Sequence, residues 1–234
     1  MKIAFIVQRY GTEILGGAEY HCRLIAERLA PRHQVDVLTT CARDYVSWQN
    51  EYPEGTDRIR GVTVRRFACS RTRNIKEFNA YSDWIFENRH SSQDEMEWLK
   101  QQGPWAPGLI EYLERHHPQY DILIFFTYLY APTVLGMKIA PGKSLLVPTA
   151  HDEPALGLKI YEPVFQNAAG IAAQVDDDPL GPLLGERVHF FPSLANHTGA
   201  VGVDHNRLGP VQDGCIGRPA FVDLGFDIHS FMLV

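Results

Sequence analysis

Lys2-Ile3-Ala4-Phe5-Ile6-Val7 is an apolar run that breaks into the loop Gly11-Thr12-Glu13-Ile14-Leu15-Gly16-Gly17 and then into a helical pattern ending at Pro31. The run is short and rich in branched side chains, so it predicts a buried parallel strand that needs cover on both faces. Strand, glycine loop and helix together form the first unit of an α/β fold.

The helix after this loop is predicted to cover one face of the strand. Apolar side chains recur on it at steps of four, three and four residues: Ala18, Cys22, Ile25 and Leu29. Charges of alternating sign stand four residues apart on another face: Glu19, Arg23 and Glu27. We expect the first face to pack on the sheet and the second to meet solvent.

The paired glycines are the first candidate binding feature. Gly16 and Gly17 lack side chains, so a ligand can approach the backbone where the free N–H groups of the helix's first turn point. The helix dipole favours phosphate there, as in a nucleotide diphosphate or a phosphosugar. The loop has neither the G-x-G-x-x-G spacing nor the P-loop lysine. The alternative is a flexible connection that uses glycine for its turn.

The rest of the chain alternates strands and helices up to about residue 173. Strands are expected at 34–40, 62–67, 121–126, 144–149 and 170–173, and a loop at 45–61. Helices are expected at 79–88, 92–102, 107–116, 132–139 and 158–166. The helix at 92–102 is assigned a capping box formed by Ser92 and Glu95. This pattern predicts a Rossmann-like parallel sheet flanked by helices, a single domain over residues 1–173.

The sequence changes character at about Gln174. Glycine and proline interrupt every later run before a helical period is established. We therefore expect residues 174–234 to form an irregular, weakly ordered tail. We interpret the abrupt change as a truncated or frame-altered carboxyl terminus.

Composition and charge narrow the class of protein. The 234 residues carry a net charge of -6, which argues against a nucleic-acid binder. The four cysteines, Cys22, Cys41, Cys69 and Cys215, lack C-x-x-C spacing and resemble small apolar residues of a reducing compartment. No signal peptide or membrane-spanning run is recognised. We expect a cytoplasmic protein that at most touches the inner face of a membrane; nothing in the sequence indicates an oligomeric state.

Six arginines lie between Arg58 and Arg73, with Arg65 and Arg66 inside a predicted strand. They are candidates for contact with an anionic lipid head group or a diphosphate-bearing acceptor. The alternative is a solvated strand and loop.

A second candidate feature follows the strand that ends near Thr149. Ala150-His151-Asp152-Glu153-Pro154 is unusually polar for the carboxyl edge of a sheet, where ligands bind in open α/β folds. His151 can donate a hydrogen bond to a sugar hydroxyl or titrate near neutral pH, and Asp152 or Glu153 can orient it. The alternative is a structural histidine. No metal-ligand spacing and no G-x-S-x-G turn occurs, so neither a metal site nor a nucleophile is predicted.

Together these motifs resemble the amino-terminal domain of family 4 glycosyltransferases, which have the GT-B fold. The resemblance covers residues 1 to about 172 and is carried by Met1 to Val7, Gly16-Gly17-Ala18-Glu19, Gly103-Pro104-Trp105-Ala106-Pro107, Asp121 to Phe126 and Thr149 to Pro154. It implies transfer of a sugar from a nucleotide-sugar donor with retention of configuration, without a cofactor or a tightly bound metal. The acceptor would be a glycan, a lipid or a small molecule, in polysaccharide or glycoconjugate synthesis.

The resemblance also implies roles for individual residues. Gly16, Gly17 and Glu19 would lie near the donor phosphates and the acceptor, and His151, followed by Asp152 and Glu153, would contact the transferred sugar. Arg65 and Arg66, or the helices between Ser92 and His116, would select the acceptor.

This sequence departs from the family after residue 172, where the donor-binding second domain and its basic pair are not recognised. The resemblance then implies a chain that is weakly active or inactive without the donor-binding half. The alternative function is a non-catalytic α/β module that binds a phosphosugar or nucleotide.

Overall fold

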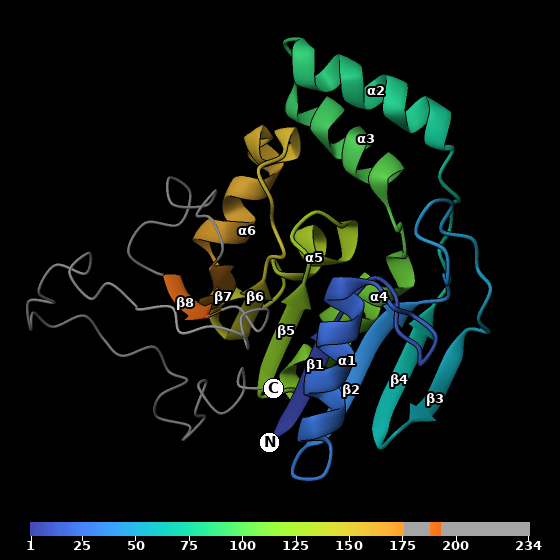
Figure 1. Ribbon diagram of the computed structural model, residues 1–234, viewed down its shortest axis with the longest axis vertical. Coiled ribbons are helices and arrows are strands. Elements are labelled where there is room, and N and C mark those ends of the chain that lie inside the picture. Colours follow the sequence, from blue (N-terminus) through green and yellow to red (C-terminus); the bar gives the residue numbers. More distant parts are fainter. Residues whose placement is uncertain (176–187, 193–234) are drawn as a thin grey trace, which may run out of the picture.

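The computed structural model describes residues 1–175 and 188–192. They form one eight-stranded sheet in the order β3-β4-β2-β1-β5-β6-β7-β8 (Figure 1). The strands are β1 Lys2–Ile6, β2 Gln34–Thr40, β3 Gly55–Ile59, β4 Val62–Phe67, β5 Ile122–Phe126, β6 Ser144–Val147, β7 Gly170–Val175 and β8 Val188–Pro192. Only β3 runs antiparallel to its neighbour among these described strands. The predicted Rossmann-like α/β class is therefore confirmed.

The α-helices are α1 Gly17–Leu29, α2 Ile75–Glu87, α3 Ser92–Gln102, α4 Pro107–His116, α5 Ala131–Gly136 and α6 Glu162–Gln166. Short 3-10 turns connect them to the strands: η1 His117–Gln119, η2 Pro141–Lys143, η3 Pro154–Gly157 and η4 Lys159–Tyr161. The helix expected at 158–166 is thus divided between η4 and α6. Helices α2 and α3 form a hairpin that projects beyond the sheet (Figure 1).

The order of the strands locates a switch point beside β1. The chain builds β2 and β4 on one side of β1, then returns to place β5, β6 and β7 in succession on its other side. Successive connections therefore diverge between β1 and β5, and the carboxyl ends of these strands border a crevice. In Figure 1 this edge lies at the upper end of the sheet, opposite the amino terminus.

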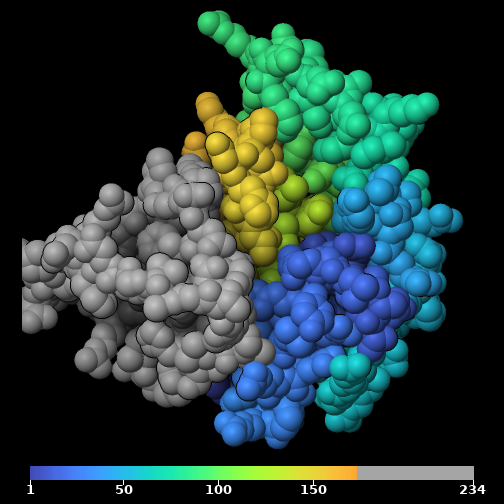
Figure 2. Space-filling view, in the orientation of Figure 1, coloured from blue at the N-terminus to red at the C-terminus, as the bar shows by residue number. Residues whose placement is uncertain are grey.

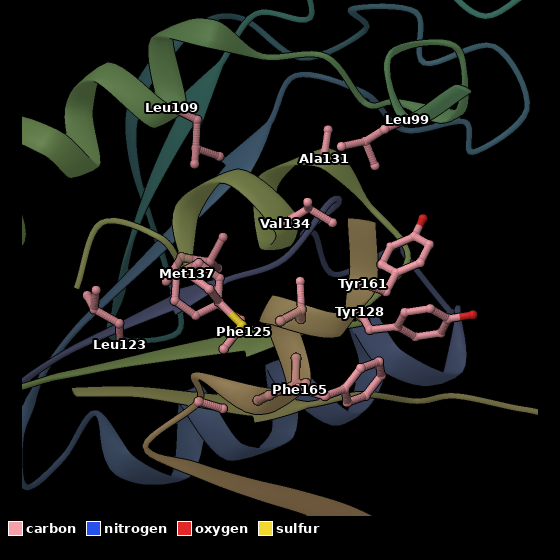
Figure 3. Close-up of a cluster of buried hydrophobic side chains, with 14 of the residues drawn as sticks. Leu99, Leu109, Leu123, Phe125, Tyr128, Ala131, Val134, Met137, Tyr161 and Phe165 are labelled. Atoms are coloured by element: carbon pink, nitrogen blue, oxygen red, sulfur yellow. The ribbon is translucent and has the colours of Figure 1, made fainter. Parts of the chain in front are cut away.

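Separate cores cover the two faces of the sheet. Alternate β1 residues Ile3 and Phe5 pack with Cys22 and Ile25 of α1, as the helix periodicity predicted. The other β1 residues, Ala4 and Ile6, face a core built with the helices α2 to α6. Figure 3 shows part of this second core, where Val134 of α5 and Met137, directly after that helix, lie over Phe125 of β5. Burial on both faces explains why these strands are continuous apolar runs.

The loop expected at 45–61 contains a strand, so that prediction was wrong in part. Gly55–Ile59 forms β3 and pairs with β4 through the turn at Arg60 and Gly61, whose φ angles are +46° and +88°. Two successive positive φ values are typical of the turns that join tight hairpins. β3 is an exposed edge strand, which has no buried face to impose an alternating apolar pattern.

The capping box of α3 is displaced by one residue from its predicted place. Ser91 caps the helix and exchanges hydrogen bonds with Asp94, whereas the prediction paired Ser92 with Glu95. Glu95 is buried instead, and its carboxylate accepts hydrogen bonds from the backbone N–H groups of Lys159 at 3.2 Å and Ile160 at 2.7 Å. This carboxylate therefore ties α3 to η4.

The prediction for the tail falls largely outside the described residues. Within it, Val188–Pro192 forms β8, which pairs parallel to β7. In the described part of the chain, no helix combines the length and the apolar character needed to cross a bilayer. Cys22, Cys41 and Cys69 are buried free thiols, in line with their predicted apolar role, and Cys215 lies outside the described residues.

Candidate functional site

The candidate site lies at the carboxyl ends of β1, β5 and β6. In the space-filling view, the yellow-green segment that follows β5 is recessed between the blue β1–α1 loop and the gold segment that follows β6 (Figure 2). We call this hollow the crevice. It is the place that the topology of an open parallel sheet favours for a ligand.

Two strained threonines join the β5 and β6 ends of the crevice. Thr127 directly follows β5 and Thr149 lies two residues after the end of β6, and their φ angles are +66° and +46°. The Thr149 hydroxyl donates to the Thr127 hydroxyl at 2.9 Å. Positive φ is rare for β-branched residues and is retained where the surroundings enforce it, often at functional sites. Thr149 was named only as the start of the stretch before His151 and Thr127 was not named, because no sequence pattern marks this conformation.

Replacing Thr149 with valine tests this join. The change preserves the shape of the side chain but removes the donor to Thr127, and we expect it to lower the free energy of unfolding by about 1–2 kcal/mol. Denaturant unfolding measures the loss, with the exposed Thr72→Val as the matched control. Equal effects of the two variants would contradict the threonine pair.

The charged face predicted for α1 is largely buried, so its assignment to solvent was wrong. Glu19 is 5% exposed and Arg23 is 7% exposed. The preceding loop folds back over the first turns of α1, and Arg23 donates to the carbonyl of Thr12 at 3.0 Å. Charge alternation at i, i+4 does not distinguish a solvated face from one covered by a polar loop.

Glu19 forms an ion pair with Arg9 at the base of the loop. Arg9 Nη2 lies 2.6 Å from Glu19 Oε1, and Gln8 donates to the same oxygen at 3.0 Å. Arg9 also donates to the carbonyl of Arg43 at 2.9 Å, and its guanidinium lies over the ring of Tyr45. The sequence prediction named Glu19 but not Arg9, whose polar loop position carried no distinguishing motif.

The two loop glycines have different surroundings. A Cβ atom on Gly16 would stand 2.2 Å from Glu19 Oε2 and 3.1 Å from Arg9 Nη2, so the space above Gly16 is filled by the ion pair. A Cβ atom on Gly17 would meet no atom within 4 Å. Of the predicted pair, Gly17 therefore offers open space to a ligand, whereas Gly16 is required by the packing of Glu19.

Tyr130 connects the two candidate loops. Burial raises the pKa of its phenol, and the carboxylates of Glu19, on α1, and Glu153, after β6, raise it further, whereas Arg73 and Arg9 lower it. The Tyr130 ring also packs edge-on against Trp48, with 5.3 Å between ring centroids. Tyr130 therefore lies within electrostatic range of one carboxylate on each side of the crevice. Sequence reasoning missed Tyr130, which stands in an apolar segment and looks like a core residue.

The residues after β6 differ in their contacts. His151 and Asp152 are exposed and make no hydrogen bond or ion pair with other described residues. Glu153 is half-buried, and its carboxylate lies close enough to Tyr128 to raise the pKa of that phenol, after the larger effect of burial. His151 is thus available to a ligand, and Glu153 is held against the tyrosines of the crevice.

Arg65 and Arg66, the predicted acceptor residues, are bound to the protein itself. Arg66 is 5% exposed, donates to the carbonyl of Tyr10 at 3.2 Å and pairs with Asp57 at 3.6 Å. Arg65 lies 3.4 Å from Asp36, a buried carboxylate that also accepts a 2.7 Å hydrogen bond from Tyr120. No contact among the described residues brings either arginine to Gly17 or His151.

Other features of the surface do not reach the crevice floor. A hollow of about 350 Å³ lies at the opposite edge of the sheet, lined by Met1, Ala30, Pro31, Arg32, His33 and Gln34. One of about 290 Å³ lies on the outer side of the β1–α1 loop, between Arg9 and Arg43. Throughout 1–172, no cluster of three or more His, Cys, Asp or Glu side chains is arranged to hold a metal ion.

The comparisons with known proteins bear on the fold. No protein-family model matches the chain, and no curated protein matches it. Among solved structures, a chain of sucrose-phosphate synthase from Thermosynechococcus elongatus matches with a TM-score of 0.50 and 14% identity, over 84% of this chain and 91% of that one. At this level of identity the match shows a shared fold.

A longer chain of the same synthase matches with a TM-score of 0.50 and 14% identity, covering 97% of this chain and 53% of that chain. The chain thus spans about half the length of this neighbour. Its Rossmann-like α/β architecture carries the crevice at the switch point of the sheet.

Proposed function

We propose that residues 1–173 are the acceptor-side domain of a retaining, family 4-type glycosyltransferase that uses a nucleotide-sugar donor. The observation that carries this proposal is the position of two loops at the carboxyl edge of the sheet beside its switch point: the β1–α1 loop, which offers an open helix N-terminus at Gly17, and the β6 loop, which carries the exposed His151. The fold that the chain shares with sucrose-phosphate synthase, a GT-B glycosyltransferase, supports the same proposal.

In the proposed reaction, the acceptor hydroxyl oxygen forms a bond to the anomeric carbon of the donor sugar. The bond from that carbon to the diphosphate oxygen breaks, its electron pair leaves with the nucleoside diphosphate, and the acceptor proton passes to the departing phosphate. Gly17 would let the diphosphate approach the first N–H groups of α1, which favour negative charge. His151 would donate a hydrogen bond to a hydroxyl of the transferred sugar, with Asp152 beside it.

A panel of nucleotide sugars tests the proposal on the purified chain. A cognate donor should raise the melting temperature, and nucleoside diphosphate should be released in the presence of an acceptor or, more slowly, water. Stabilisation without release of nucleotide would favour the alternative, a binding module for phosphosugars or nucleotides. Absence of stabilisation by every donor would contradict both.

The variant His151→Ala tests whether this histidine contributes to the binding of a nucleotide sugar. Because the side chain is exposed and makes no bond with the residues that the structure describes, we expect the free energy of unfolding to stay unchanged, while the dissociation constant for the stabilising nucleotide sugar rises about tenfold. Calorimetric titration measures the change, with His116→Ala at the end of α4 as the control. An unchanged dissociation constant would remove His151 from the site.

A further inference from the structure

We propose that the hollow between the end of α1 and the start of β2 binds a terminal phosphate group. We call it the amino-edge hollow; its volume is about 350 Å³, and it is lined by Met1, Ala30, Pro31, Arg32, His33 and Gln34. This volume lies within the range of pockets that take small ligands. The hollow lies at the end of the sheet opposite the crevice, beside the amino terminus, so the proposal goes beyond the proposed function (Figure 1).

Arg32 supplies free donors to this hollow. Its side chain is exposed and makes no hydrogen bond or ion pair with any other residue that the structure describes. Glu27, the last acidic residue of α1, is paired with Arg60 at 3.3 Å. A guanidinium presents a planar fork of N–H donors that fits two phosphate oxygens. Arg32 is therefore available to hold the phosphate.

His33 supplies a second donor beside Arg32. Its Nδ1 atom is buried without a hydrogen-bond partner in the described part of the chain, and the rest of the ring lines the hollow. A buried N–H without an acceptor is rarer than a buried acceptor without a donor. We therefore assign the proton of the neutral ring to Nε2, from which it can be donated to a phosphate oxygen.

The electrostatics of the hollow favour an anion. Burial lowers the pKa of His33, and the positive charges of the Met1 amino group and Arg32 lower it further. These groups repel one another when the imidazole is protonated, and a bound phosphate would relieve that repulsion. The dipole of α1 opposes an anion with about half a negative charge at the end of the helix. The full positive charge of Arg32 exceeds that half charge.

The alternative role for these side chains is to bind the last carbonyls of α1 as a C-terminal cap. The carbonyl of Leu29 instead accepts from the backbone N–H groups of Arg32 and His33, each at 3.0 Å. Neither side chain donates to a carbonyl among the described residues. Both side chains are thus left to bind a ligand.

NMR titration of the purified chain with inorganic phosphate and with glycerol 3-phosphate tests the hollow, and glycerol is the uncharged control. The ring signals of His33, assigned through His33→Gln, should shift, and the pKa of His33 should rise because a bound phosphate favours the imidazolium. We expect Arg32→Gln to raise the dissociation constant about tenfold. Arg28→Gln removes an exposed cation of α1 outside the hollow and should bind as the parent does.

A lipid phosphate presents the same group, so flotation with vesicles is the second measurement. Vesicles of phosphatidylcholine are compared with and without phosphatidic acid. Binding of the soluble phosphates without flotation would assign the hollow to a soluble ligand. Flotation that requires phosphatidic acid and is lost in Arg32→Gln would place a lipid phosphate there. Arg32→Gln and Arg28→Gln should both keep the melting temperature of the parent because both side chains are exposed.

The proposal would be overturned if both soluble phosphates left the His33 signals unchanged and no vesicle floated the chain. An unchanged dissociation constant in Arg32→Gln would also overturn it. Phosphate binding that weakens in Gly17→Ala but not in Arg32→Gln would place the anion in the crevice, with the same consequence. None of these results uses a nucleotide sugar, so the failure of the hollow and the failure of the proposed function are distinguishable.

Discussion

Glu19→Ala should lower the free energy of unfolding by about 3–5 kcal/mol. The variant leaves the guanidinium of Arg9, which is 12% exposed, without the carboxylate that lies 2.6 Å away. It also removes the acceptor of the Gln8 side chain, so two polar groups lose their partner at once. For a chain of this size the melting temperature should fall by roughly 6–20 °C.

Glu111→Ala is the matched control for this prediction. Glu111 pairs with Arg115 at 3.3 Å on an exposed face of α4, and such surface pairs contribute about 0–1 kcal/mol. Thermal and urea unfolding of both variants give the comparison. If Glu19→Ala were no more destabilising than Glu111→Ala, the buried ion pair beneath the glycine loop would not be formed.

Gly16→Ala and Gly17→Ala should have opposite effects on stability. The Cβ of Gly16→Ala collides with the Glu19 carboxylate and forces it away from Arg9, which should lower the free energy of unfolding by about 1–3 kcal/mol. Gly17→Ala places its Cβ in open space at the first position of α1, and we expect a gain of about 0.4–1 kcal/mol.

The variants Gly16→Ala and Gly17→Ala also distinguish an effect on the free energy of unfolding from an effect on ligand affinity. Gly17→Ala fills the space through which a ligand approaches the helix N-terminus, so its affinity for a nucleotide sugar should fall although the fold is stronger. Urea unfolding and calorimetric titration on the same preparations measure the two properties. Tighter binding by Gly17→Ala, or a greater stability loss for Gly17→Ala than for Gly16→Ala, would contradict the described loop.

The sheet could be predicted because its buried strands appear in the sequence as short, continuous apolar runs. The runs at β1 and β5 are apolar on both faces, which is typical of a covered parallel sheet. β3 could not be predicted in this way, since an exposed edge strand has no apolar alternation. The N-cap of α3 was predicted one residue too late, because Ser91 with Asp94 and Ser92 with Glu95 both have the spacing of a capping box.

The candidate site was predictable in part. The glycine loop and the residues after β6 were recognised because polar or glycine-rich segments follow apolar runs at the carboxyl edge. Thr127 and Thr149 could not be found, because their positive φ angles depend on tertiary contacts. Tyr128 and Tyr130 look like core residues in sequence, and only the fold brings them to Glu153.

The arginine cluster shows how charge patterns mislead. Six arginines between residues 58 and 73 resemble an anion-binding surface, yet Arg66 and Arg73 bond backbone carbonyls inside the protein. An arginine can serve several carbonyls at once, so the residue type does not distinguish a structural brace from a ligand contact. The acceptor role of Arg65 and Arg66 remains a prediction.

The central claim is that the β1–α1 loop and the β6 loop bind one ligand in a shared crevice. Amide hydrogen exchange of the whole chain, with and without a stabilising nucleotide sugar, tests it most directly. We predict slower exchange in both segments 9–18 and 149–156 at the same ligand concentration. Protection confined to one of these loops, or lying outside both, would contradict the shared site.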